Sequence, residues 1–291
     1  MRRMNIVVTG ASAGIGEALT RALSQEGHRL FVCARRAEKL KQITDDGALA
    51  QWRVCDISEE TQVADFAEWI ATQTDSVDAV VNCAGLFGSI GPMHETDTEE
   101  WFQTLKINLL GPYLTNKYFF LALLKSFYPR IVNFSGGGAF NPFPHYSAYA
   151  VSKAATVRMT ENMAVELAPY GIMVNAVAPG FVWTEIHEAT LKAGPEKAGK
   201  EHYEATLKKK EAGAVPIEIP VACVRFLLSE QADGLTGKTL SASFDPWSAP
   251  EFQERIEEIN RSELYTMRRI NLAHLPNDPL SAALSAAKKK G

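Results

Sequence analysis

Cysteine is scarce in this sequence, and the few cysteines that occur are scattered. No two of them form the Cys-x-x-Cys spacing that is typical of metal and redox sites. Three lie in apolar runs that read as strands, which predicts buried, reduced thiols in a reducing cytosol. The six histidines form no metal-ligand pattern, so we expect no metal site. The cysteines are Cys33, Cys55, Cys83 and Cys223.

Long apolar runs and an excess of one charge are also absent. No run approaches the roughly 18 apolar residues of a membrane helix, and the basic start MRRMNIVVTG enters a strand without a signal-type apolar stretch. With 30 basic and 34 acidic residues the net charge is −4, which gives no general attraction to nucleic acid or anionic membranes. The sequence predicts a soluble, cytoplasmic protein with a small-molecule partner.

A glycine-rich turn near the start has the setting of a phosphate-binding site. Residues 5–9 read as a buried strand, 10–16 (GASAGIG) as a turn, and the chain up to about 26 as a helix. Glycines let the backbone approach a pyrophosphate, and the helix N-terminus offers it unpaired N–H groups and a positive dipole. The alternative is an ordinary glycine-rich turn. We expect a dinucleotide to bind here.

The end of the second predicted strand, 29–34, indicates which dinucleotide binds. In dinucleotide folds this position meets the adenosine ribose, where an acid binds the 2′-hydroxyl of NAD and an arginine accommodates the 2′-phosphate of NADP. Here Ala34 is followed by Arg35 and Arg36, so the acid is missing and cations are present. NADP(H) is therefore favoured over NAD(H). The alternative is a solvated pair of arginines at a helix start.

Strands and helices continue to alternate along the chain. Strands are expected near 51–55, 79–81 and 171–178, with helices at about 59–73 and from about 99. This alternation predicts a parallel sheet with right-handed crossovers and with ligands at the carboxyl ends of the strands. At those ends, Asp56 is placed to accept from an adenine amino group. Residues 82–85 are placed to line the middle of the cofactor.

A tyrosine and a lysine lie four residues apart on a predicted helix, at Tyr149 and Lys153. Residues at this spacing share one helix face, so their polar ends can converge on one substrate atom. A nearby ammonium would favour the phenolate and lower the pKa of the tyrosine from its usual value of about 10. Tyr149 could then exchange a proton with an alcohol or a carbonyl. Alone the pair is weak, because the same spacing occurs by chance on exposed helix faces.

Several motifs in a fixed order resemble the short-chain dehydrogenase/reductase family in its shorter, single-domain form. They are TGASAGIG at 9–16, NCAG at 82–85, Asn108, YAVSK at 149–153 and PGFVWT at 179–184, and the resemblance covers roughly 4–243. It implies an α/β, Rossmann-type doubly wound domain with about seven parallel strands and helices on both faces. It also implies a nicotinamide cofactor and hydride transfer at a carbon that bears oxygen.

The resemblance assigns roles to individual residues. Tyr149 would be the general acid/base, and Lys153 would hold the nicotinamide ribose while lowering the pKa of the tyrosine. Asn108 would anchor a water in the proton relay, and Thr184 would meet the carboxamide. The residues expected to bind the cofactor are Gly10, Ser12, Gly14, Ile15, Gly16, Arg35, Arg36, Asp56, Ile57, Asn82, Ala84, Gly85, Tyr149, Lys153, Pro179, Gly180, Val182 and Thr184.

One position departs from the family pattern. Members place a catalytic serine thirteen residues before the tyrosine, where this sequence has Gly136, with Ser135 one residue earlier. Adjacent side chains near a strand end point to opposite faces, so we expect Ser135 to face away. The missing donor could come from Ser135, Ser147, His145 or the substrate. The glycines 136–138 could also make room for a bulky substrate or permit an unusual turn. The candidate substrate residues are Ser135, Gly136, Gly137 and His145.

The rest of the chain divides into a lid and an extension. We expect a catalytic domain at 1–248, with the family's substrate lid at about 185–215, and a C-terminal extension at 249–291. Residues 251–270 have helical periodicity, and a Pro-Asn-Asp-Pro break follows at 276–279. The extension could cover a neighbour's active site or a subunit interface, or be half-ordered beyond 276. Apolar helices at 109–127 and 149–167, which pair in this family, predict a homodimer or homotetramer.

Two functions are compatible with these observations. The first is an NADP-dependent oxidoreductase that interconverts a secondary alcohol and a ketone, with Tyr149 as general acid/base. The alternative is a non-catalytic NADP(H)-binding or sensor protein that has lost the catalytic serine. Retention of the proton-relay residues favours the enzyme, because a sensor needs no relay. The sequence does not choose among a sugar or cyclitol, a 3-oxoacyl thioester and another ketone as substrate.

Overall fold

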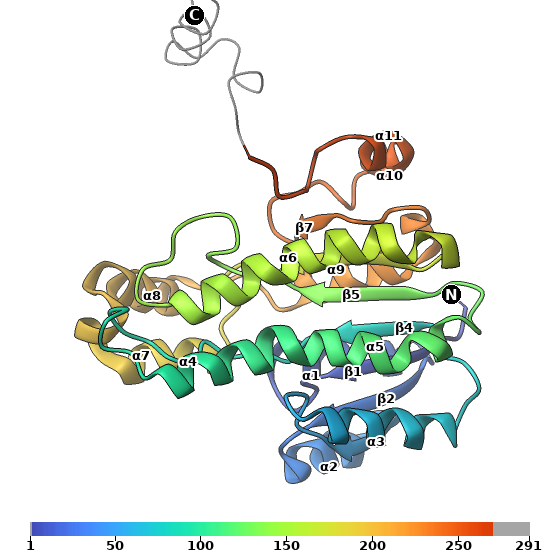
Figure 1. The fold of residues 1–291 in the computed structure, drawn as a ribbon, viewed down its shortest axis with the longest axis horizontal. Helices are drawn as coiled ribbons and strands as arrows, with labels where there is room; N and C mark the ends of the chain where they lie inside the picture. The colour runs from blue at the N-terminus through green and yellow to red at the C-terminus, as the bar shows by residue number, and fades with distance from the viewer. Residues whose placement is uncertain (1, 270–291) are drawn as a thin grey trace, which may run out of the picture.

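A computed structural model describes residues 2–269, and its centre is one sheet (Figure 1). Seven parallel strands run in the order β3-β2-β1-β4-β5-β6-β7. The strands are β1 Asn5–Thr9, β2 Arg29–Ala34, β3 Ala50–Val54, β4 Ala79–Asn82, β5 Arg130–Phe134, β6 Met173–Ala178 and β7 Thr239–Ser241. This topology confirms the predicted Rossmann-type sheet, whose strand order reverses between β1 and β4.

Helices cover both faces of the sheet (Figure 1). They are α1 Gly14–Gln25, α2 Ala37–Asp45, α3 Glu60–Ala71, α4 Thr98–Leu105, α5 Gly111–Leu123, α6 Ser147–Leu167, α7 Glu185–Ala198, α8 Lys200–Ala212, α9 Glu218–Leu228, α10 Pro250–Gln253 and α11 Ile256–Arg261. A π-helical turn at Lys106–Leu110 joins α4 to α5, so the apolar helix predicted from 109 begins in an irregular turn. Helix α7 is kinked at Gly194, where the backbone is not helical.

The core has two layers because side chains alternate along each strand. In β1, Ile6 and Val8 belong to the cluster that contains Leu19 of α1 and Val224 of α9. Val7 points to the opposite face and joins the cluster built with α3 and α5. All three β1 side chains are fully buried. Burial on both faces explains the continuous apolar run of this strand.

The C-terminal extension differs from its predicted helical periodicity. Helices α10 and α11 are short, and the chain from 262 to 269 contains neither helix nor strand. Phe252, Ile256 and Ile259 are buried in the cluster shared with α1 and α9. The first part of the extension therefore packs on the main core of the same chain. The predicted break at 276–279 lies outside the described residues.

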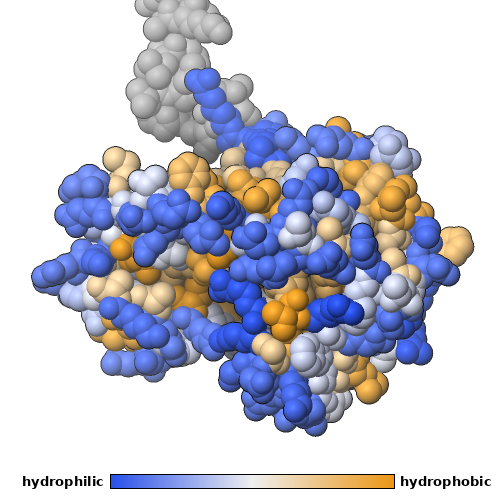
Figure 2. All heavy atoms as spheres, turned by 60° about the horizontal axis from the view of Figure 1, so that its bottom comes forward, coloured by the Kyte–Doolittle hydropathy of each residue, from blue (hydrophilic) through white to orange (hydrophobic). Residues whose placement is uncertain are grey.

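Both polar and large apolar side chains are exposed on the surface. On the face shown in Figure 2, hydrophilic side chains dominate, and hydrophobic ones form smaller patches among them. Within residues 2–269, no helix has the length and apolar character needed to cross a membrane.

Candidate active site

A cavity of ≈ 1140 Å³ lies at the carboxyl ends of the strands. Its lining includes residues that follow β1 (Gly10), β2 (Arg35), β4 (Cys83), β5 (Ser135) and β6 (Pro179). This is the place where open parallel sheets bind ligands. The cavity continues from the glycine turn to α7 and α8, so one space joins the predicted cofactor and substrate regions.

In the glycine turn after β1, no glycine side chain covers the backbone at the start of α1. Gly10 has φ +72°, and a Cβ there would lie 2.6 Å from the Ala84 Cα. A Cβ at Gly16 would overlap the carbonyl oxygen of Gly10. These positions therefore require glycine, and they leave the first N–H groups of α1 open to a ligand. The turn fits the pyrophosphate of a dinucleotide.

Two arginines stand at the end of β2, beside this turn. The Arg36 guanidinium donates to Ser12 Oγ at 3.1 Å and pairs with Glu185 at 2.7 Å. The Arg35 guanidinium lies 3.8 Å from the Asp56 carboxylate. All of these side chains line the cavity. The two arginines therefore border the cavity while remaining largely exposed to solvent.

Tyr149 and Lys153 converge on the cavity from α6. Tyr149 is 7 % exposed, and the Lys153 ammonium lies 5.6 Å from the centre of its ring. Lys153 Nζ donates to the Phe134 carbonyl at 2.8 Å. Burial raises the pKa of Tyr149 and lowers the pKa of Lys153 to about 8. The predicted lowering of the tyrosine pKa is therefore wrong for this geometry, because desolvation of the phenol dominates.

Asn108 belongs to the π-helical turn between α4 and α5 and lies behind the cavity wall. Its amide nitrogen donates to the Leu86 carbonyl at 2.8 Å and to Ser152 Oγ at 3.1 Å. Its amide oxygen accepts from the Leu86 N–H at 3.0 Å. These bonds fix the loop after β4 against α6. The anchoring of a water by Asn108 stays a prediction.

Tyr149 occupies the space that a side chain at position 136 would need. A Cβ added at Gly136 would overlap the phenolic oxygen of Tyr149 and lie 3.1 Å from its Cζ. Gly138 has φ +84°, and a Cβ there would lie 2.8 Å from Phe143 Cβ. At Gly137 the nearest atom would be 3.9 Å away. Of the three glycines, only Gly137 leaves the open space that was expected for a bulky substrate.

Most of the predicted residues line the cavity. They are Gly10, Ser12, Gly14, Ile15, Gly16, Arg35, Arg36, Asp56, Ile57, Ala84, Gly85, Ser135, Gly136, Gly137, Tyr149, Lys153, Pro179, Gly180, Val182 and Thr184. Ser135, expected to face away, is among them, and its Oγ is buried without a partner among the described residues.

The predicted residues Asn82 and His145 lie off the cavity lining. The Asn82 amide donates to Asn116 at 2.8 Å and to Asn133 at 2.9 Å, so it ties β4 to β5 and α5. His145 Nδ1 lies 2.8 Å from the Lys197 carbonyl oxygen, at the end of α7. Ser147, considered as a replacement donor, accepts instead from the Trp101 indole at 3.0 Å.

An aromatic wall beside Tyr149 was missed by sequence reasoning. The Phe87 ring lies 4.8 Å from Tyr149 and 5.5 Å from His187, and Phe143 lies 4.8 Å from His202. Burial lowers the pKa of His187 to about 4 and also lowers that of His202, so both imidazoles are neutral at pH 7. These residues come from separate loops and from α7 and α8, and no local motif marks them.

Comparisons with known proteins agree with this geometry. The family model described as short chain dehydrogenase matches residues 4–194. An uncharacterized oxidoreductase, YxjF, of Bacillus subtilis (strain 168) is 32% identical over 254 residues, which span 82% of this chain and 96% of the relative.

Two solved structures share the fold and carry different cofactors. A single-residue variant of the actinorhodin polyketide ketoreductase, with NADPH, has a TM-score of 0.74 and 29% identity, and the match covers 82% of this chain and 95% of that one. An NAD+-bound xylitol dehydrogenase has a TM-score of 0.74 and 26% identity, with 82% and 96% covered.

The family match spans most of the chain and includes the glycine turn, the tyrosine and the lysine. It does not favour the alternative of a non-catalytic binding protein. Another relative, levodione reductase of Leifsonia aquatica, is 30% identical over 239 residues, which span 78% of this chain and 88% of the relative. The chain belongs to the short-chain dehydrogenase/reductase family and is an NAD(P)-dependent oxidoreductase.

Proposed function

We propose that the chain is an NADP-dependent oxidoreductase that interconverts a secondary alcohol and a ketone, with Tyr149 as the general acid/base. The observation that carries this proposal is the single cavity that joins the glycine turn to Tyr149 and Lys153. When bound there, the nicotinamide donates or accepts the hydride. The chain's own residues must hold the substrate oxygen against a proton donor and exclude water.

Tyr149 is suited to donate that proton. Burial raises its pKa, so the phenol is protonated at neutral pH. Its oxygen makes no hydrogen bond to another described residue, which leaves it available to a substrate. Lys153, with a pKa lowered to about 8, still carries its charge on most molecules at pH 7. That charge stabilises the phenolate that remains after the proton has left.

The preference for NADP rests on three side chains. Ser12, Arg35 and Arg36 lie together where the adenosine ribose binds in dinucleotide folds. A 2′-phosphate would receive charge-assisted hydrogen bonds from two guanidinium groups. NAD has no 2′-phosphate to pair with the two arginines. Position 34, where an acidic residue would bind the 2′-hydroxyl of NAD, is Ala34.

The missing serine hydroxyl needs a substitute, because one positioned donor is worth about 10²- to 10³-fold in rate. Two side chains on the cavity lining offer one. Ser135 Oγ is buried without a partner among residues 2–269. The neutral imidazole of His187 also has a buried nitrogen with no partner in that part of the chain. We propose that these groups, or a hydroxyl of the substrate, share the contact to the substrate oxygen.

The subunit is proposed to form a homodimer or homotetramer. Helices α5 and α6 belong to the same layer over the sheet (Figure 1). Apolar side chains remain exposed on both, including Leu121 at 70% and Val165 at 76%. Such a surface is typical of a protein interface.

The proposed reaction is tested by following NADPH oxidation by the purified protein. The panel holds cyclic ketones, sugar ketones and 3-oxoacyl thioesters, and each is also tested with NADH. We expect turnover of at least one ketone, with NADPH preferred. NADPH binding without turnover of any panel member, in either direction, would contradict the proposal.

A further inference from the structure

Part of the cavity wall comes from the C-terminal extension. Tyr265 and Thr266 line the cavity, although they follow α11 and lie far beyond the family match. Beside them on the lining are Ser241, at the end of β7, and Asp245. None of these residues belongs to the glycine turn or to the proposed proton-transfer group. This corner of the cavity is therefore additional to the reaction site.

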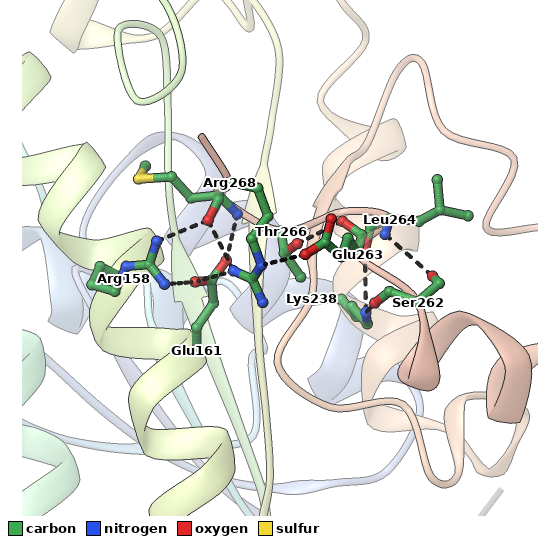
Figure 3. Close-up of polar contacts among 9 residues, drawn as sticks. Arg158, Glu161, Lys238, Ser262, Glu263, Leu264, Thr266 and Arg268 are labelled. Atoms are coloured by element: carbon green, nitrogen blue, oxygen red, sulfur yellow. Dashed lines mark hydrogen bonds and ion pairs between the residues drawn. The ribbon is translucent and has the colours of Figure 1, made fainter. Parts of the chain in front are cut away.

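Two buried charges hold the extension in place (Figure 3). Glu161 of α6, 7 % exposed, accepts from the Met267 N–H and pairs with Arg268 at 3.2 Å. Lys238, 2 % exposed, donates to the Ser262 carbonyl at 2.8 Å and to the Leu264 carbonyl at 3.1 Å. These anchors flank Tyr265 and Thr266 on both sides. The segment is thus fixed to the helix that carries Tyr149.

Tyr265 adopts a backbone conformation that is unusual for its residue type. Its φ of +60° lies in the left-handed region, which a tyrosine enters only when its surroundings impose it. The Tyr265 carbonyl accepts from the Thr239 N–H of β7 at 2.8 Å, and the ring lies 5.6 Å from Phe252. The surroundings therefore keep Tyr265 at the cavity in a strained conformation.

The polar groups in this corner include one buried hydroxyl without a partner among the described residues and one half-buried carboxylate. Thr239 is one of the residues that line the cavity, and its Oγ1 is buried with no hydrogen-bond partner among the described residues. Burial raises the pKa of Asp245, whose carboxylate accepts from the Ser241 N–H at 2.6 Å. Burial and the Asp245 charge both raise the pKa of Tyr265, and both residues line this part of the cavity. Buried polar groups without partners call for an explanation, and a ligand hydroxyl would supply one.

Building on the proposed function, we propose that Tyr265, Asp245 and Thr239 form a subsite for a hydroxyl group of the substrate, away from its reacting carbon. The Asp245 carboxylate accepts a hydrogen bond from the substrate hydroxyl, and Tyr265 or Thr239 donates a hydrogen bond to the hydroxyl oxygen. The substrate class is then a hydroxylated ketone and its polyol product. Glu161 acts as a positioning residue, because it fixes the segment that carries Tyr265.

Direct binding tests the subsite with defined probes. Calorimetry of the full chain saturated with NADP⁺ would give dissociation constants for cyclohexanone and for its 2-, 3- and 4-hydroxy derivatives. In the wild type we expect at least one hydroxy derivative to bind about tenfold or more tightly than cyclohexanone, as for a hydrogen bond to a charged group. Asp245→Asn and Tyr265→Phe should reduce this preference severalfold, with cyclohexanone affinity unchanged.

Control variants separate the subsite from general damage. Asp65→Asn makes the same chemical change at an exposed position on α3 and should keep the preference. Glu161→Gln should weaken the preference while leaving NADPH affinity intact. Equal binding of all four probes in the wild type, or a preference that survives Asp245→Asn, would overturn the subsite. Failure of the proposed oxidoreductase function would give a different result from failure of the subsite. The hydroxy derivatives would still bind more tightly, but no probe would be turned over with NADPH.

Discussion

At the scale of single residues, Gly136 and Tyr149 have to be considered together. The phenolic oxygen of Tyr149 occupies the space that a side chain at 136 would need. If the glycine were only a lost donor, restoring serine would raise the rate on a simple ketone. The geometry gives the opposite expectation, since any Cβ at this position displaces the tyrosine.

Gly136→Ser and Gly136→Ala should therefore both lower kcat. A misplacement of about 1 Å at a reacting group can cost about 10²-fold in rate, and we expect a loss of that order. Gly137→Ala is the matched control, because its nearest neighbour would be 3.9 Å away. Steady-state kinetics on one confirmed ketone would compare kcat of these three variants with that of the wild type. Faster turnover by Gly136→Ser would show that the tyrosine does not occupy that space in the working enzyme.

The ionisation of Lys153 gives the reaction a pH dependence. Its pKa is lowered to about 8 by burial, so its charge is present below that pH and is lost as the pH rises through it. The profile of kcat/KM for NADPH reports groups of the free enzyme. This parameter should fall above about pH 8, and the fall should move to higher pH in Lys153→Arg, because arginine keeps its charge. A profile that stays flat to about pH 10 in the wild type, near the ordinary lysine value, would contradict a role for the lysine charge.

The same shift has a consequence for stability. The folded-state pKa of Lys153, about 8, lies below the ordinary value of 10.5. Between these values the unfolded chain binds more protons than the folded chain, so this group makes the protein more stable as the pH rises. This contribution to stability therefore rises over the same pH range in which we expect kcat/KM to fall. The titration of Lys153 therefore does not by itself destabilise the fold above about pH 8.

At the scale of elements, we propose that the residues at the end of β2 set the preference between NADP(H) and NAD(H). Removing one arginine that contacts a phosphate should cost about 10- to 100-fold in affinity, as for a hydrogen bond between charged groups. Arg35→Asp should therefore weaken NADP(H) by about this factor and leave NAD(H) nearly unchanged. Titrations of both cofactors measure the effect, with Arg53→Asp on the exposed part of β3 as a charge-matched control. Equal losses of affinity for the two cofactors would show that Arg35 does not contact the 2′-phosphate.

The elements around the cofactor could be predicted because their signals are local. The turn that contains Gly10 and Gly16 follows an apolar strand directly, and both glycines are required by close backbone contacts. Tyr149 and Lys153 share one helix, so their spacing alone places them together. For these features, neighbouring residues in the sequence are also neighbours in the structure.

Other parts of the site depend on contacts between distant segments. Phe87 contacts His187 only after the loop following β4 has packed against helix α7, and His202 of α8 likewise contacts Phe143 from another segment. Tyr265 reaches the cavity because Glu161 and Lys238 hold a segment without regular structure. The pKa of Tyr149 was predicted in the wrong direction, because spacing shows a neighbouring charge but not the depth of burial.

At the scale of the whole molecule, α5 and α6 leave apolar side chains uncovered. Light scattering at micromolar concentration should give a mass of at least twice the 32.0 kDa of one chain. Leu121→Asp together with Val165→Asp should shift the protein towards the monomer, because both replace exposed apolar groups on these helices with charges. Leu49→Asp, an equally exposed position before β3, is the control and should change nothing. A wild-type mass of 32.0 kDa would contradict the oligomer.

The central claim is that the protein transfers a proton through Tyr149 during ketone reduction. The most direct measurement compares kcat and the NADPH dissociation constant for the wild type, Tyr149→Phe and the surface control Tyr170→Phe. Loss of the general acid should lower kcat by about 10²- to 10⁴-fold. NADPH affinity should stay nearly unchanged, and Tyr170→Phe should behave like the wild type. Full turnover by Tyr149→Phe on a confirmed ketone would contradict the account.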